Sequence, residues 1–61
     1  MTHTEADYIR AGYRYEMADP QRAAGVAEKI RAMLESEHVK DKPEARRLIE
    51  QGRTEARQVK R

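Results

Sequence analysis

The 61-residue sequence predicts an all-α fold, a single small three-helix domain. Three observations predict it. Apolar residues recur at helical spacing in three separate segments. Thr4 and Asp7 have the spacing of a capping box, which is typical of a helix start, and Thr2 with Glu5 is an equally allowed earlier start. Prolines at positions 20 and 43 suit the first turn of a helix, where a missing N–H costs no hydrogen bond. We expect helices over about 4–18, 20–37 and 43–60, with 1–61 forming one domain.

The first expected helix, 4–18, is apolar around most of its circumference. One stripe holds Tyr8, Ala11, Gly12, Tyr15 and Ala18, and the other holds Ala6, Ile9, Tyr13 and Met17. A helix of this kind is usually covered from two directions. In so short a chain, the second cover is expected to come from another copy or a partner. We therefore predict Ile9, Tyr13 and Met17 as protein-interface residues.

Gly12 lies in the middle of this helix and costs about 1 kcal/mol relative to alanine. Either it lets another helix approach closely, or it is a weak point, and the sequence leaves both interpretations open. Residues 8–12 and 48–52 share an isoleucine and a glycine at matching positions, which is too little to establish a repeat.

The second expected helix, 20–37, has the clearest amphipathic pattern of the chain. Asp19 precedes Pro20 and can cap the helix. The apolar stripe comprises Ala23, Val26, Ala27, Ile30, Met33 and Leu34. We expect the other two helices to cover this stripe. The short join around Asp19 allows an antiparallel hairpin or a kink, and we favour a tight helical hairpin.

The third expected helix, 43–60, starts at Pro43, although Lys42 is a poor cap and Asp41 stands one residue early. Its apolar face comprises Ala45, Leu48, Ile49, Gly52, Ala56 and Val59. Because the central residues of this face are small, the helix is expected to dock closely but weakly.

The chain has few residues from which to build a core. Leu, Ile and Val number eight, and Phe and Cys are absent. A small scaffold without disulfides or a metal is commonly stabilised by association. The sequence therefore predicts a homo-oligomer or a complex with another protein.

Positive charge is concentrated near the C-terminus. The net charge is +4 over 38–61 and −2 over 1–37, giving +2 in total. Arg46, Arg53, Arg57 and Lys60 share one flank of the third helix, which could follow phosphates of a nucleic acid. The alternative is a solvated face on which Glu50 pairs with Arg46 or Arg53.

Catalytic and metal-binding patterns are lacking. Ser36 is the only serine, and no glycine-rich phosphate loop is present. His3 would be third from a free amino terminus, a geometry that can bind Cu(II), but trimming of Met1 would destroy it. We expect no enzyme activity, cofactor or metal. No long apolar run predicts a signal peptide or a membrane span, so a cytoplasmic protein is expected.

The function that these patterns favour is a small helical protein–protein interaction module, homo-oligomeric, with no membrane partner. The alternative is a small nucleic-acid-binding protein, such as a DNA-binding one, that uses the basic flank of the third helix.

Overall fold

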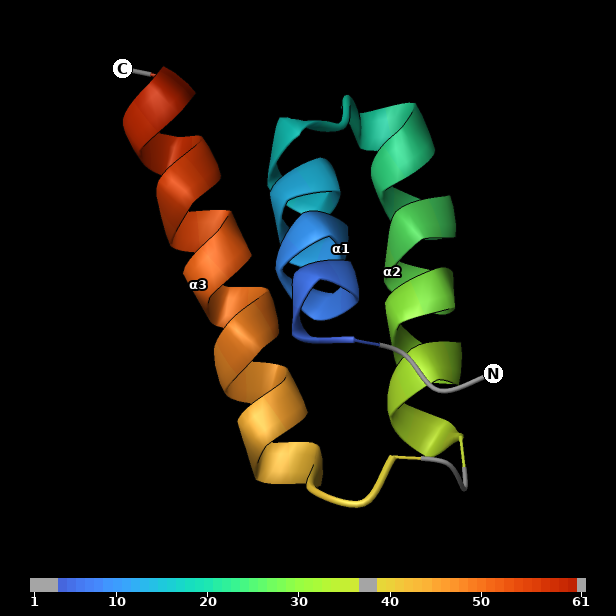
Figure 1. The fold of residues 1–61 in the computed structure, drawn as a ribbon. Helices are drawn as coiled ribbons and strands as arrows, with labels where there is room; N and C mark the ends of the chain where they lie inside the picture. The colour runs from blue at the N-terminus through green and yellow to red at the C-terminus, as the bar shows by residue number, and fades with distance from the viewer. Residues whose placement is uncertain (1–3, 37–38, 61) are drawn as a thin grey trace.

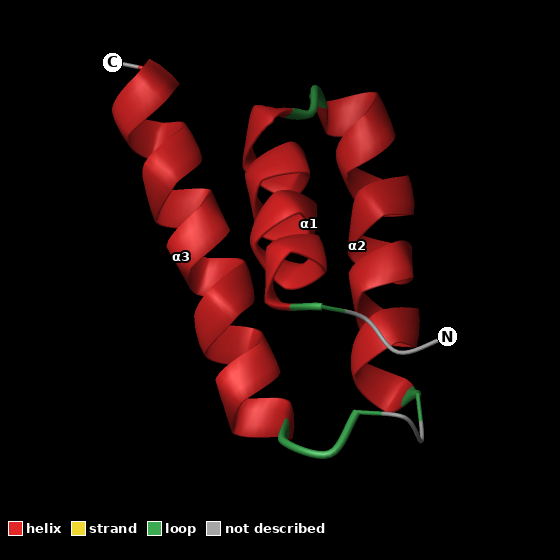
Figure 2. Cartoon of the chain, viewed as in Figure 1, coloured by secondary structure: helices red, strands yellow, loops and turns green. Residues whose placement is uncertain are grey.

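Three helices joined by short turns make up the protein in a computed structural model, which describes residues 4–36 and 39–60. They are α1 (Glu5–Met17), α2 (Pro20–Glu35) and α3 (Lys42–Lys60) (Figure 2). The predicted all-α three-helix fold is confirmed. In Figure 1, α2 runs antiparallel to α1, and α3 runs parallel to α1 on its other side. The first two helices thus form the expected hairpin.

Side-chain caps begin α1 and α2 as the sequence predicts. The Asp7 amide donates to Thr4 Oγ1 at 3.3 Å, and the Thr4 amide donates to Asp7 Oδ2 at 2.8 Å. This reciprocal capping box satisfies donors that the first helical turn leaves unpaired. The Arg22 amide donates to Asp19 Oδ1 at 2.9 Å, with Pro20 in the first turn of α2.

The start of α3 corrects the sequence expectation by one residue. The Glu44 amide donates to Asp41 Oδ1 at 3.0 Å, so the aspartate caps the helix and Lys42 is its first residue. Pro43 takes the second helical position, where its missing N–H again costs no helical bond.

α1 and α2 also end earlier than expected. α1 ends at Met17 with Ala18 as its C-cap, and α2 ends at Glu35 with Ser36 as its C-cap. The expected α2 end at Glu37 lies outside the described residues. The proposed copper geometry at His3 lies outside them as well.

The closest packing in the molecule is between α1 and α3, at two glycines. A Cβ atom added to Gly12 would lie 1.9 Å from the Ile49 carbonyl oxygen, and one added to Gly52 would lie 1.9 Å from the Ile9 carbonyl oxygen. No side chain fits at either position. The structure confirms the packing interpretation of Gly12, and it explains the short similarity between 8–12 and 48–52. Each segment presents a glycine to the isoleucine carbonyl of the other.

The hydrophobic core follows from this close contact. Its buried residues are Tyr8 from α1, Met33 from α2, and Ala45, Leu48 and Ile49 from α3. Ala56 is fully buried nearby, while Val59, expected on the same face, is 62% exposed. α3 therefore contributes most of the buried side chains, and the expectation that it docks weakly is wrong.

α2 is the least covered helix, contrary to the expectation that the other two helices cover its apolar stripe. Of its six-residue apolar stripe, only Met33 is buried, while Ala23, Val26, Ala27, Ile30 and Leu34 are half-buried. The physical reason is that hydrophobic periodicity measures how much a helix gains from burial. It does not measure how closely two backbones can approach, which the glycines of α1 and α3 decide.

Membrane insertion is a separate matter of helix length and polarity. Within the described residues, each of the three helices is too short or too polar to cross a bilayer.

Candidate interaction surfaces

The incomplete cover of α2 leaves two grooves along the two flanks of its apolar stripe. The first, which we call the α2/α3 groove, has a volume of about 430 Å³. Its lining is Tyr15 from α1, Ala27, Ile30 and Leu34 from α2, and Arg46, Ile49, Glu50 and Arg53 from α3. The groove exists because α2 and α3 make little direct contact while both pack on α1. It has an apolar floor and a rim with both signs of charge.

The second groove lies between α1 and α2, and we call it the α1/α2 groove. It has a volume of about 360 Å³ and is lined by Asp7, Arg10, Ala11 and Arg14 from α1 and by Val26, Lys29, Ile30 and Met33 from α2. Arg14 and Val26 also line a shallower hollow near the hairpin turn, together with Tyr13, Met17, Ala18 and Arg22. The two hollows therefore share part of their walls, and they follow α1 and α2 side by side.

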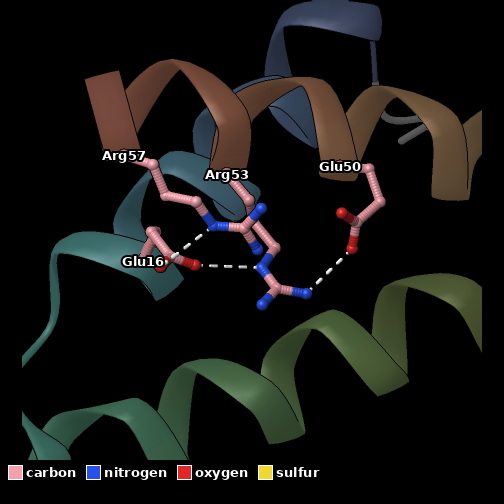
Figure 3. A network of polar contacts seen from close by, with 4 residues as sticks. All are labelled: Glu16, Glu50, Arg53 and Arg57. Carbon is pink, nitrogen blue, oxygen red and sulfur yellow. Dashed lines mark hydrogen bonds and ion pairs between the residues drawn. The ribbon is translucent and has the colours of Figure 1, made fainter. Parts of the chain in front are cut away.

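A carboxylate on α1 binds two arginines of α3 (Figure 3). The Arg53 Nε donates to Glu16 Oε2 at 3.1 Å, and the Arg57 Nε lies 3.3 Å from Glu16 Oε1. The Glu16 side chain is 19% exposed, so this pair of contacts is partly shielded from water. The hydrogen bond from Arg53 lowers the pKa of Glu16 below its ordinary value, and the charge of Arg57 adds to the effect.

Arg53 makes two further contacts that fix its guanidinium. Its Nη1 donates to Glu50 Oε1 at 2.8 Å, one helical turn earlier. Its Cζ lies 5.1 Å from the centre of the Tyr15 ring, a cation–π distance. The hydrogen bond with Glu16 raises the pKa of Arg53, so the side chain stays charged.

These contacts decide how much of the predicted basic flank of α3 is free. Arg53 and Arg57 are held by Glu16, and only Arg46 and Lys60 are without an ion pair to another described residue. The predicted pairing of Glu50 is confirmed with Arg53. The flank is thus half neutralised by carboxylates of the chain itself, which the sequence could not reveal because Glu16 lies 37 residues before Arg53.

The predicted protein-interface residues on α1 are not brought together as one surface. Ile9 is half-buried and packs against the core, with its carbonyl beside Gly52. Tyr13 is also half-buried, and it lines the hollow near the hairpin turn together with Met17, which is 43% exposed. The second apolar stripe of α1 therefore receives part of its cover from α3.

Sequence reasoning missed the cations of the α1/α2 groove. Arg10 and Arg14 lie outside both apolar stripes of the first helix, and no role was predicted for them or for Lys29. The available signal was the hairpin itself, because antiparallel helices bring the flanks of their two apolar stripes to one seam.

In the part of the chain that the structure describes, His, Cys, Asp and Glu do not gather in groups of three or more suited to holding a metal ion. Comparisons of the chain with known protein families, curated proteins and solved structures found no match. The two grooves are therefore the features from which a function can be inferred.

Proposed function

We propose that this protein is a small helical protein–protein interaction module that assembles with a second copy of itself through the α2/α3 groove. The observation that carries the proposal is the incomplete burial of α2, whose apolar stripe the other two helices cover only in part. Ala27, Ile30 and Leu34 form an apolar strip that the chain covers only partly. Covering it with a partner removes apolar surface from water, at roughly 25 cal/mol per Å².

The charges on the rim favour a second copy as that partner. A two-fold interface uses the same patch on both molecules, so the patch must be complementary to itself. Arg46 and Glu50 give the rim of the α2/α3 groove opposite charges. Glu50 Oε1 already accepts a hydrogen bond from Arg53, but a carboxylate can accept several, and the Glu50 side chain is 58% exposed. Two copies can therefore pair the basic rim of one with the acidic rim of the other.

A matched pair of substitutions on α2 tests the proposal. Ala27→Arg places a long charged side chain on the floor of the α2/α3 groove and should weaken self-association at least about tenfold. Ala24→Arg makes the same change at an exposed position of the same helix that lines neither groove, and it should leave association unchanged. Sedimentation equilibrium gives the association constants.

A wild-type chain that stays monomeric throughout the micromolar range contradicts the proposal. Equal association of the Ala27→Arg and Ala24→Arg variants contradicts it too, because the interface then lies elsewhere. Circular dichroism of both variants verifies that the helices are retained.

A further inference from the structure

The α1/α2 groove differs from the α2/α3 groove in its charge. Arg10 and Arg14 stand on its α1 side, and Lys29 stands on its α2 side. Within residues 4–36 and 39–60, none of these three cations has an ion-pair partner. The carboxylate of the lining, Asp7, accepts a hydrogen bond from the Thr4 amide in the capping box. Asp7 keeps its negative charge, so the rim has three cations against one carboxylate and is net positive on both sides.

The floor between these cations is apolar. It consists of Ala11 from α1 and of Val26, Ile30 and Met33 from α2. Arg22 extends the positive rim toward the hairpin turn, where the neighbouring hollow shares Arg14 and Val26 with the groove. The groove and the neighbouring hollow together thus have an apolar floor and four cations on the rim, two from each helix.

We infer that the α1/α2 groove binds an amphipathic helix of another protein, one whose apolar stripe is flanked on both sides by Asp or Glu. A helix fits the long shape of the seam, because antiparallel helices leave a groove in which a third helix packs at an ordinary interaxial distance of about 8–10 Å. Binding of an amphipathic helix in a hydrophobic groove is a common mode of recognition. The bound helix must have acidic flanks because the rim of the groove carries four cations.

The charge of the rim and the apolar floor also disfavour two other ligands of this groove, a second copy of the chain and a nucleic acid. A second copy bound with the same groove would bring two net-positive rims together, each with four cations and one carboxylate, and like charges across an interface are unfavourable. A nucleic acid would satisfy the cations, but its phosphates offer nothing to the apolar floor. The inference goes beyond the proposed self-association, since the two grooves lie on opposite flanks of the α2 stripe and share only Ile30 among their lining residues.

The probe for this inference is a fluorescent synthetic peptide. A length of about 18 residues forms about five helical turns and exceeds the length at which isolated helices are marginal. Its Leu and Ala residues form one stripe with Glu on both flanks. One control peptide carries Lys in place of every Glu, and the other has the acidic composition in scrambled order. A single-stranded DNA oligonucleotide of equal charge is the third control. Fluorescence anisotropy with the full-length protein measures binding.

Three variants of the protein make the test specific. Lys29→Glu should weaken binding of the acidic peptide at least about tenfold. Arg31→Glu is the matched control, because Arg31 is exposed on the same helix and lines neither groove, and it should change binding less than about twofold. Val26→Thr keeps the size of the side chain but adds a hydroxyl to the floor, and it should weaken peptide binding a few-fold.

The expected result is binding of the acidic amphipathic peptide alone, weakened by salt and by both groove variants. The inference is overturned if the scrambled peptide binds equally well, if Lys29→Glu and Arg31→Glu have equal effects, or if no peptide binds. DNA binding that is at least as tight and insensitive to Val26→Thr also overturns it and assigns the groove to a nucleic acid. Repeating the titration with Ala27→Arg separates this result from self-association, because that variant should bind the peptide normally.

Discussion

Glu16 on α1 connects that helix to α3 through two ion pairs. It accepts contacts from Arg53 and Arg57 across the α1–α3 interface, and Arg53 in turn covers the Tyr15 ring. Removing Glu16 leaves two neighbouring arginines facing each other without a counter-charge. Such an arrangement is destabilising at close range, although solvent and salt reduce the effect.

The lowered pKa of Glu16 leads to a pH prediction with a definite sign. A carboxyl whose pKa is lower in the folded state stabilises the fold above its ordinary value of 4.5, and this contribution is lost as the pH falls through the lowered folded pKa. Glu16→Gln should therefore reduce the free energy of unfolding at neutral pH and have little effect in strong acid. Urea denaturation at about pH 7 and about pH 2 measures the difference.

The matched control for this change is Glu55→Gln. Glu55 is exposed on α3, and among the described residues it has no ion pair. Its substitution should leave stability almost unchanged at both pH values. If the Glu16 and Glu55 variants lose stability equally at neutral pH, the ion pairs of Glu16 do not stabilise the fold.

Among the three helices, packing is decided by two glycines. α2 has a continuous apolar stripe, yet α1 and α3 form the tight pair because Gly12 and Gly52 bring their backbones together. The existence and approximate ends of all three helices follow from apolar spacing and caps. The identity of the tight pair does not follow, since a glycine at mid-helix is equally consistent with a weak point.

Gly12→Ala should destabilise the protein although alanine is the better helix former. The added Cβ meets the Ile49 carbonyl oxygen, a backbone atom that cannot move aside without shifting α3. Overpacking of this kind costs about 1–3 kcal/mol or more, which exceeds the propensity gain of about 1 kcal/mol. Gly25→Ala is the matched control. Nothing lies within 4 Å of its added Cβ, so it should stabilise by up to about 1 kcal/mol.

Chemical denaturation of the two glycine variants distinguishes these effects. Equal gains in stability for Gly12→Ala and Gly25→Ala would show that the α1–α3 interface relaxes freely, contrary to the close contact described above.

The candidate surfaces were less accessible to prediction than the helices. A partly covered helix face was expected, but on α1 and not on α2, because the sequence does not reveal that α3 covers part of the second α1 stripe. The basic flank of α3 was visible as a pattern, and its neutralisation by Glu16 was not. Contacts between residues distant in sequence decide both outcomes, and periodicity within one helix contains no information about them.

At the scale of the whole molecule, stability and self-association are expected to be linked. A partner that binds only the folded chain stabilises it by mass action. If two copies assemble through the α2/α3 groove, each tenfold rise in protein concentration adds about 1.4 kcal/mol per dimer. For a domain this small, that corresponds to a rise of several degrees in Tm.

Calorimetry over about a hundredfold range of concentration measures this linkage. The Tm of the wild type should rise with concentration, and that of the Ala27→Arg variant should rise less. A wild-type Tm independent of concentration would contradict assembly in the folded state.

The reciprocal contact of Gly12 and Gly52 with two isoleucine carbonyls has a consequence for how this chain can evolve. Any larger residue at either glycine collides with the backbone of the opposite helix, so these two sites are closed to mutational drift. The rims of the two grooves consist of water-exposed side chains, whose exchange costs little in stability. Substitutions on the groove rims can therefore change binding specificity while the packing of α1 against α3 is retained. In the same way, one fold can carry many unrelated functions.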